Sequence, residues 1–183
     1  MEKAVYSAVL TPFKKDLTID TKLFISHCEF LLKNNISLAP LGTTGEANSI
    51  SISEKLDLIK TIVNSDLPKE KIIIGTGNTS FVDAALLTKT AVENKIYSVL
   101  LLPPFYYKNV SDEGVYQYYK EIINTVKSIN LRIFLYNIPQ VSGVTISIDL
   151  VNRLKKEFIN FAASIFTLVV ALIHPEQPIC SPS

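Results

Sequence analysis

The sequence has no tryptophan, and only two cysteines and two histidines occur among its 183 residues. Cys28 and Cys180 lie far apart and form no disulfide framework, and Cys28 falls within an apolar helical pattern. Neither His27 nor His174 has a second ligand at metal-binding spacing. We therefore expect neither a metal site nor a disulfide-stabilised extracellular fold.

An excess of charge of one sign is also missing. Eighteen Lys and Arg residues against seventeen Asp and Glu residues give a net charge of +1, and no run of basic residues occurs. This pattern argues against a nucleic-acid partner. The apolar run after residue 4 is broken by Ser7, Thr11 and Pro12, which is not the layout of a signal peptide. We therefore expect a cytoplasmic protein with no membrane partner.

What the chain does contain is a regular alternation of short apolar segments with amphipathic ones. Strands are expected at 4–10, 37–41, 71–76, 98–102 and 132–136, with starts about thirty residues apart. A residue suited to cap a helix follows each strand: Asp20, Ser51, Ser80, Ser111 and Ser147. Ser51 and Glu54 have the spacing of a capping box.

Each expected helix has a candidate apolar face. In the third helix this face comprises Val82, Leu86, Thr90 and Val92. In the fourth helix it comprises Val115, Tyr116, Tyr118, Tyr119, Ile122, Ile123 and Val126. Continuous apolar strands between amphipathic helices predict an α/β fold with a parallel sheet covered by helices. At this point both an open doubly wound sheet and a closed (β/α)8 barrel remain possible.

In either architecture, functional groups gather at the carboxyl ends of the strands. One such end carries Gly42-Thr43-Thr44-Gly45-Glu46, whose amides and hydroxyls suit a small anion at a helix entrance. The alternative explanation of these residues is a tight turn whose backbone angles require glycine. Gly75-Thr76-Gly77 lacks the spacing of a dinucleotide fingerprint and is interpreted as a turn.

Three tyrosines also follow strands. Tyr106 and Tyr107 come shortly after the fourth strand, where amphipathic aromatic residues often simply pack. Tyr136 ends the fifth strand and is explained equally well as a core residue. Its phenol and the Thr43 and Thr44 hydroxyls nevertheless fall on one face, where a proton can pass between them.

These motifs together resemble one family. Gly42-Thr43-Thr44-Gly45-Glu46 after the second strand, Pro104-Phe105-Tyr106-Tyr107 after the fourth and Tyr136-Asn137-Ile138-Pro139 after the fifth are similar to the dihydrodipicolinate synthase and N-acetylneuraminate lyase family. Leu10-Thr11-Pro12-Phe13 matches the end of its first strand. The resemblance covers roughly residues 4–160 and implies the first five to six units of a (β/α)8 barrel.

The resemblance also implies an aldolase-type reaction on pyruvate, which is held as an imine on a lysine without an external cofactor. Thr43, Thr44 and Gly45 would bind the pyruvate carboxylate. Tyr136 would relay a proton, and Thr43 would link it to Tyr107, a residue usually supplied by a neighbouring subunit. The expected partners are thus a small 2-oxo acid and further copies of the chain.

The sequence departs from the family at the lysine itself. The resemblance places this lysine about 28 residues after Tyr136, in a stretch that reads Asn160-Phe161-Ala162-Ala163-Ser164. No lysine follows Lys156, and Lys155 and Lys156 belong to the preceding helix. We therefore divide the chain into an N-terminal barrel part, 1–160, and a divergent tail, 161–183.

Three explanations of the tail remain open. A frameshift or early stop explains the abrupt loss of similarity best. A membrane anchor fits less well, because the apolar stretch 161–173 is shorter than the roughly 20 residues of a spanning helix. A half-barrel that pairs with another chain is the third. An unfinished sheet would expose an edge, so we expect self-association.

The resemblance implies a lyase of the pyruvate imine family, and the missing lysine predicts that this chain is inactive. The synthase branch usually carries an arginine two residues after the proline of the tyrosine motif, but this chain has Val141. That substitution favours cleavage or condensation of a sugar acid or a related 2-oxo acid. Condensation of pyruvate with an aldehyde, as in dihydrodipicolinate synthase, is an alternative. A non-catalytic remnant or interaction protein is another.

Overall fold

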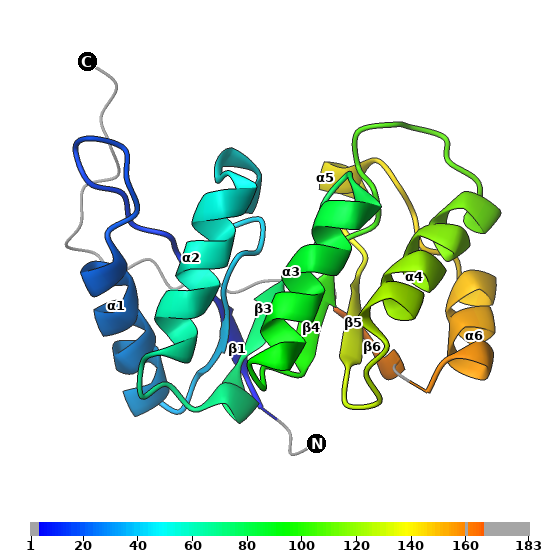
Figure 1. The fold of residues 1–183 in the computed structure, drawn as a ribbon. Coiled ribbons are helices and arrows are strands. Elements are labelled where there is room, and N and C mark those ends of the chain that lie inside the picture. The colour runs from blue at the N-terminus through cyan, green and yellow to red at the C-terminus, as the bar shows by residue number, and fades with distance from the viewer. Residues whose placement is uncertain (1–3, 160, 167–183) are drawn as a thin grey trace.

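The computed structural model describes residues 4–159 and 161–166, the last six by their backbone alone. Its helices and strands alternate along the chain (Figure 1). They are β1 (Tyr6–Ala8), α1 (Thr21–Lys33), β2 (Ser37–Ala39), the 3-10 turn η1 (Ala47–Ser49), α2 (Ile52–Val63), the 3-10 turn η2 (Lys69–Lys71), β3 (Ile73–Gly75), α3 (Phe81–Glu93), β4 (Ser98–Leu101), α4 (Asp112–Val126), β5 (Arg132–Tyr136), α5 (Pro139–Ser142), α6 (Ile148–Glu157) and β6 (Phe161–Phe166).

The strands are parallel and lie in chain order. β1 pairs with β2, and β3 to β6 form a second run; one parallel bridge, between Leu38 and Ile72, connects β2 to β3. Figure 1 shows α1 to α4 and α6 along one face of these strands. A doubly wound sheet has helices on both faces, whereas a (β/α)8 barrel has this order and this single outer layer. The predicted partial barrel is therefore confirmed.

The first residues of the tail form a sixth strand. Residues Phe161–Phe166 form β6, which lies parallel to β5 and pairs Phe166 with Tyr136. The pairing is irregular between Ile133 and Leu135. The remainder of the tail, 167–183, lies outside the described residues.

All five predicted helix starts are confirmed. The side chain of each capping residue accepts a hydrogen bond from a backbone N–H in the first turn of its helix. Ser51 and Glu54 form the predicted capping box, in which the Glu54 carboxylate also accepts from the Ser51 N–H at 3.0 Å. These local contacts satisfy amides that would otherwise lack partners at the helix ends.

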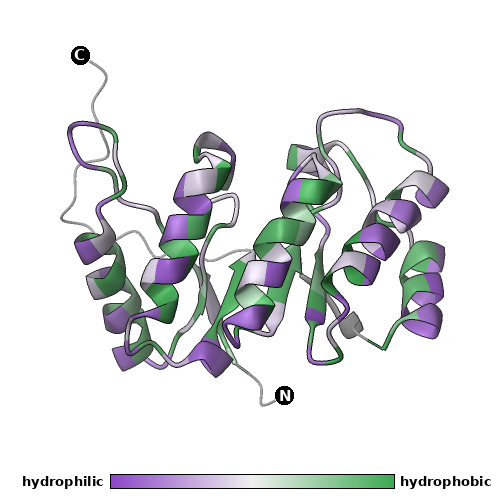
Figure 2. Ribbon diagram, viewed as in Figure 1, coloured by the Kyte–Doolittle hydropathy of each residue, from purple (hydrophilic) through white to green (hydrophobic). Residues whose placement is uncertain are grey.

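The core lies between the strands and the inner faces of the helices. In Figure 2 the strands are largely hydrophobic, whereas the helices carry both hydrophobic and hydrophilic residues. All seven predicted residues of α4 are buried, from Val115 to Val126. The Tyr119 hydroxyl donates to the Leu101 carbonyl at 3.3 Å, so this ring is buried with its polar atom satisfied.

The predicted buried face of α3 is largely wrong. Val82 and Leu86 are 59% and 43% exposed. The buried residues are instead Ala84, Ala85, Leu87, Thr88, Ala91 and Val92, of which only Val92 was expected. The helix packs against both α2 and α4, and its small side chains allow a close approach to these neighbours. Because α3 has apolar residues on several sides, their spacing alone did not identify the inward face.

Helix α6 is held against α4 by a polar cluster around Tyr116. The Tyr116 hydroxyl donates to the Glu157 carboxylate, and the guanidinium of Arg153 lies 3.5 Å from the centre of the Tyr116 ring. Arg153 also pairs with Glu113, and its hydrogen bond holds the pKa of that carboxyl below its usual range. These contacts position α6 and, through it, the start of β6.

The end of β2 lies directly against β3. The Gly75 N–H donates to the Pro40 carbonyl at 2.8 Å. A Cβ atom on Gly75 would lie only 2.0 Å from the Leu41 carbonyl oxygen, which belongs to the rigid backbone. This position therefore requires glycine for close approach, although its backbone angles do not.

Replacing Gly75 with alanine should destabilise the fold by at least about 1–3 kcal/mol, because the two backbones must separate. Urea denaturation followed by circular dichroism measures this loss. Gly114→Ala is the matched control, since its Cβ would meet only the Ser111 Oγ, at 3.6 Å. We expect no loss there, because alanine is the better helix former. Equal midpoints for the Gly75 variant and the unmodified chain would contradict the close contact.

Candidate functional site

The motif after β2 forms a compact turn of its own. Leu41 and Glu46 have the left-handed φ values of 57° and 53°, and the Glu46 N–H donates to the Thr43 carbonyl at 3.0 Å. The turn leads into η1, and α2 begins only at Ile52. The expected position at a helix entrance is therefore wrong, because η1 and the capping box separate the motif from α2.

The neighbouring strand end holds this turn in place. The Thr11 hydroxyl donates a buried hydrogen bond of 2.7 Å to the Gly45 carbonyl. A Cβ atom on Gly45 would lie 2.6 Å from the Val9 carbonyl oxygen, so a larger residue does not fit. The ends of β1 and β2 are thus joined through the motif, which fixes the backbone of Thr43 and Thr44.

A small cavity lies at the carboxyl ends of β2 to β5. It is lined by Leu41, Gly42, Thr43, Ala47, Asn48, Gly75, Gly77, Leu100, Leu102 and Tyr136. Two predicted site residues, Thr43 and Tyr136, therefore share one cavity although they are distant in sequence. Its volume of about 20 Å³ has room for about one water molecule. A three-carbon acid would extend beyond it.

Hydroxyl groups at this site have free hydrogen-bonding capacity. Within the described residues, the hydroxyls of Thr43, Thr44 and Tyr136 make no hydrogen bond, and the Thr43 and Thr44 amides likewise donate to no partner. Tyr136 is only 9% exposed. Among the described residues, every fully enclosed side-chain polar atom has a hydrogen-bond partner. The Tyr136 hydroxyl has no partner, so it is not fully enclosed and retains some access to solvent.

The other predicted residues do not line this cavity. Thr44 is half-buried, and Gly45 is buried with its carbonyl engaged by Thr11. Tyr107 is 74% exposed and contacts Tyr106 edge to face, with ring centres 5.2 Å apart. One copy of the chain therefore brings together Thr43 and Tyr136 but leaves Tyr107 at the surface.

Two loop contacts near this end were not predicted from the sequence. The Lys108 ammonium donates to the Phe105 and Ser142 carbonyls at 2.6 and 3.0 Å, which ties the loop after β4 to α5. The Tyr118 hydroxyl donates to the Asn78 carbonyl at 2.6 Å and holds the loop after β3. Burial raises the pKa of Tyr118 well above its usual value. These contacts have no signal in the sequence, where Lys108 looks like an ordinary surface residue and Tyr118 like an ordinary core residue.

Asn48 and Gly77 are further cavity residues that the sequence analysis missed. Asn48 brings the cavity an amide side chain, and its position just after the Gly-Thr-Thr-Gly-Glu motif was the only signal. A Cβ atom on Gly77 would lie 2.7 Å from the Leu102 Cβ. The glycine turn after β3 therefore also brings β3 and β4 close together beside the cavity.

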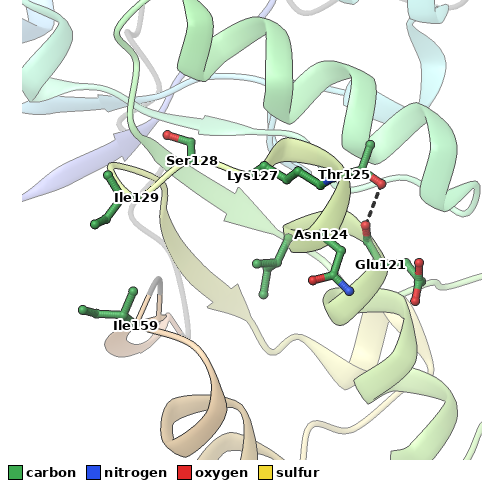
Figure 3. A pocket seen from close by; sticks show the side chains of 8 residues that line it. Glu121, Asn124, Thr125, Lys127, Ser128, Ile129 and Ile159 are labelled. Carbon is green, nitrogen blue, oxygen red and sulfur yellow. Dashed lines mark hydrogen bonds between the residues drawn. The ribbon is translucent and has the colours of Figure 1, made fainter.

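A larger hollow lies at the opposite end of the strands, beside the end of α4 (Figure 3). Its volume is about 650 Å³, and it is lined by Glu121, Ile123, Asn124, Thr125, Lys127, Ser128, Ile129 and Ile159. The Thr125 hydroxyl donates to the Glu121 carbonyl at 2.7 Å. This α4 hollow includes no residue of the predicted site.

Other chemistries have little support in the described residues. Residues 4–159 contain no group of His, Cys, Asp and Glu side chains that could hold a metal ion. Burial raises the pKa of the Cys28 thiol to about 12, so this cysteine is a core residue and not a nucleophile. No helix in this part of the chain has the length and apolar composition needed to span a membrane. His174 and Cys180 lie outside the described part.

The stretch in which the resemblance expects the family lysine, about 28 residues after Tyr136, falls in β6. Ser164 is one residue before Ile165, which pairs with Leu135 beside Tyr136. The backbone of this strand thus reaches the same end of the barrel as Thr43 and Tyr136, with serine at the place where the resemblance expects lysine.

Comparison with known proteins agrees with this geometry. The model of the dihydrodipicolinate synthetase family matches residues 1–165, which includes the beginning of the segment 161–183. A 4-hydroxy-tetrahydrodipicolinate synthase from Chloroherpeton thalassium is 34% identical over 157 residues, covering 85% of this chain and 51% of that protein. The chain spans about half the length of the curated relatives it matches.

Solved structures show the same relationship. Dihydrodipicolinate synthase from Agrobacterium tumefaciens superposes with a TM-score of 0.83 at 33% identity, and 2-keto 3-deoxygluconate aldolase from Picrophilus torridus with 0.78 at 30% identity. In both cases the match covers 88% of this chain and 57% of the other. The family match over nearly the whole chain and the shared strand order lead to one conclusion: the chain belongs to the dihydrodipicolinate synthetase family.

Proposed function

We propose that this chain carries the carboxylate-binding and proton-transfer residues of a lyase that acts on pyruvate or a related 2-oxo acid. The observation that carries the proposal is that Thr43 and Tyr136, from two different strand ends, line one cavity. Family membership supports it, because relatives of this chain are named as synthases and aldolases.

Thr43 and Thr44 are the proposed carboxylate site. Their hydroxyls and amides have no partner within the described residues, and the Thr11 to Gly45 bond holds the turn that presents them. A carboxylate accepts several such hydrogen bonds, and fixed neutral donors bind it without the cost of burying a cation. The small cavity would accept only this end of the acid, while the rest would extend outward.

Tyr136 is the proposed proton carrier. Imine formation adds an amine to the C2 carbonyl of the acid and expels water, so a group must protonate the leaving oxygen. A phenol that is mostly buried but has no partner in the described residues is suited to this transfer. Because serine occupies the expected lysine position, we propose that this chain does not form the imine itself.

Two substrate classes are supported by different observations. Val141 in place of an arginine favours a 2-oxo acid without a second carboxylate, and the likeness to 2-keto 3-deoxygluconate aldolase agrees with a sugar acid. The curated relatives named 4-hydroxy-tetrahydrodipicolinate synthase favour condensation of pyruvate with an aldehyde. The non-catalytic alternative differs from both, because it predicts no imine chemistry even when a lysine is supplied.

Borohydride trapping with pyruvate tests this proposal. The unmodified chain should acquire no adduct, whereas Ser164→Lys should acquire one reduced pyruvate at position 164, located by peptide mass spectrometry. Adding Tyr136→Phe to that variant should slow trapping about 100-fold, since it removes the proton carrier. Adding Tyr106→Phe instead is the matched control, because Tyr106 is exposed and lies outside the cavity.

Two results would count against the proposal. A pyruvate adduct on the unmodified chain would show that another lysine performs the chemistry. Failure of a folded Ser164→Lys variant to trap pyruvate would favour the non-catalytic alternative.

We also propose that copies of the chain associate through the exposed Tyr106 and Tyr107. Together these rings form an aromatic patch of the kind that contributes strongly to protein interfaces. Tyr107 is exposed and does not line the cavity of its own copy, so we propose that the family link to Thr43 is made by a neighbouring copy.

Tyr107→Ser should weaken self-association about tenfold or more, because interface tyrosines often contribute about 2 kcal/mol. Sedimentation equilibrium measures the change. Ile129→Ser is the matched control, since Ile129 is equally exposed but lies at the other end of the strands. A chain that remains monomeric at all accessible concentrations would refute this interface.

A further inference from the structure

A second hollow lies at the amino ends of the central strands. It has a volume of about 540 Å³ and is lined by Ser65, Asp66, Leu67, Lys69, Glu70, Lys95, Tyr97, Ser98 and Arg132. This size lies within the range of small-ligand sites. We call it the strand-base hollow.

The strand-base hollow is remote from the proposed pyruvate site. Its residues come from the connection between α2 and β3, from the connection between α3 and β4, and from the first residues of β4 and β5. In a parallel barrel these connections meet at the amino ends of the strands (Figure 1). Thr43 and Tyr136 lie at the carboxyl ends. A ligand in this hollow would therefore not touch the proposed pyruvate site.

Three basic side chains meet at the hollow without a protein partner. Lys69, Lys95 and Arg132 form no ion pair and no side-chain hydrogen bond within the described residues. Asp66 and Glu70 line the same hollow and form no ion pair with these cations within the described residues. The hollow thus combines an excess of cationic donors with two carboxylate acceptors, all available to a ligand.

Lys95 occupies an unusual backbone position. Its φ of 68° is left-handed, where glycine or asparagine is the common residue after a helix. The corresponding residue after α1 is Asn35, with a φ of 58°. Placing lysine there strains the backbone and brings a cation to the rim of the hollow. Lys127 ends α4 with a φ of 50° but lies outside the strand-base hollow.

An aromatic residue completes the site. The Arg132 N–H donates to the Tyr97 carbonyl at 2.8 Å, and Ser98 pairs with Arg132 across β4 and β5. The backbone therefore places Tyr97, Ser98 and Arg132 on adjacent strand ends. Tyr97 is partly exposed at the hollow. Aromatic rings commonly pack against the C–H face of a polyhydroxylated ligand, while carboxylates accept from its hydroxyls.

We propose that the strand-base hollow binds a small phosphorylated polyhydroxy compound. Arg132 and Lys95 bind the phosphate, for which a planar guanidinium and an ammonium are well suited. Asp66 and Glu70 accept hydrogen bonds from hydroxyl groups, and Tyr97 packs against the carbon chain. This site is independent of the proposed imine chemistry.

NMR titration of the full chain with glycerol 3-phosphate, inorganic phosphate and glycerol, at constant ionic strength, tests the proposal. Saturable shifts of the amides of residues 95–98 and 132 are expected with glycerol 3-phosphate. Inorganic phosphate should bind about tenfold more weakly, because it lacks the hydroxyl contacts, and glycerol alone should not saturate the site.

Arg132→Gln should weaken glycerol 3-phosphate binding about tenfold, and Lys95→Gln about fivefold. Lys127→Gln is the matched control, since it removes the same charge from a lysine that also has a left-handed φ but lies outside the hollow. It should change affinity less than about twofold. Equal losses for Lys95→Gln and Lys127→Gln, or shifts that never saturate, would overturn the site. Equal affinity for the two phosphates would overturn the role of the hydroxyl contacts.

Discussion

The backbone contact between the end of β2 and β3 is the constraint on which both the fold and the candidate site depend. The Leu41 carbonyl occupies the space that a side chain on Gly75 would need, and the Pro40 carbonyl accepts from the Gly75 N–H. Apart from these contacts, one bridge between Leu38 and Ile72 joins the β1–β2 pair to the other strands. Leu41 and Gly75 also line the cavity, so the packing that joins β2 to β3 also places Thr43.

The two ends of the strands offer different chemistry. At the carboxyl ends, Thr43, Asn48 and Tyr136 bring neutral polar groups to a cavity of about 20 Å³, where we propose carboxylate binding and proton transfer. At the amino ends, charged side chains surround a wider hollow. A contact between loops, that of Lys108 with Ser142, ties the loop after β4 to α5 at the first end. This division follows from the parallel sheet, which directs all βα connections to one end and all αβ connections to the other.

Much of this arrangement was predictable where the controlling interactions are local. Ser51 caps α2 and Ser111 caps α4 because the hydrogen bonds span only a few residues. The buried face of α4 was predicted because its polar and apolar residues separate cleanly. The buried face of α3 was not predicted, because Val82 and Leu86 are apolar yet exposed. The small residues of α3 are buried instead, where the helix packs against its neighbours. The turn at residues 42–46 was expected at a helix entrance because η1 has no sequence signal of its own.

The sequence by itself determined the order of strands and helices, the helix caps and the residues that carry the family resemblance, because each depends on neighbours along the chain. Only the tertiary structure decided that Thr43 and Tyr136 share a cavity, that Tyr107 stays at the surface and that Lys95 and Arg132 meet at the strand base. Those relations depend on backbone approach and register between segments far apart in the chain. Gly75 shows why: the need for glycine there comes from a carbonyl more than thirty residues earlier in the chain, at Leu41.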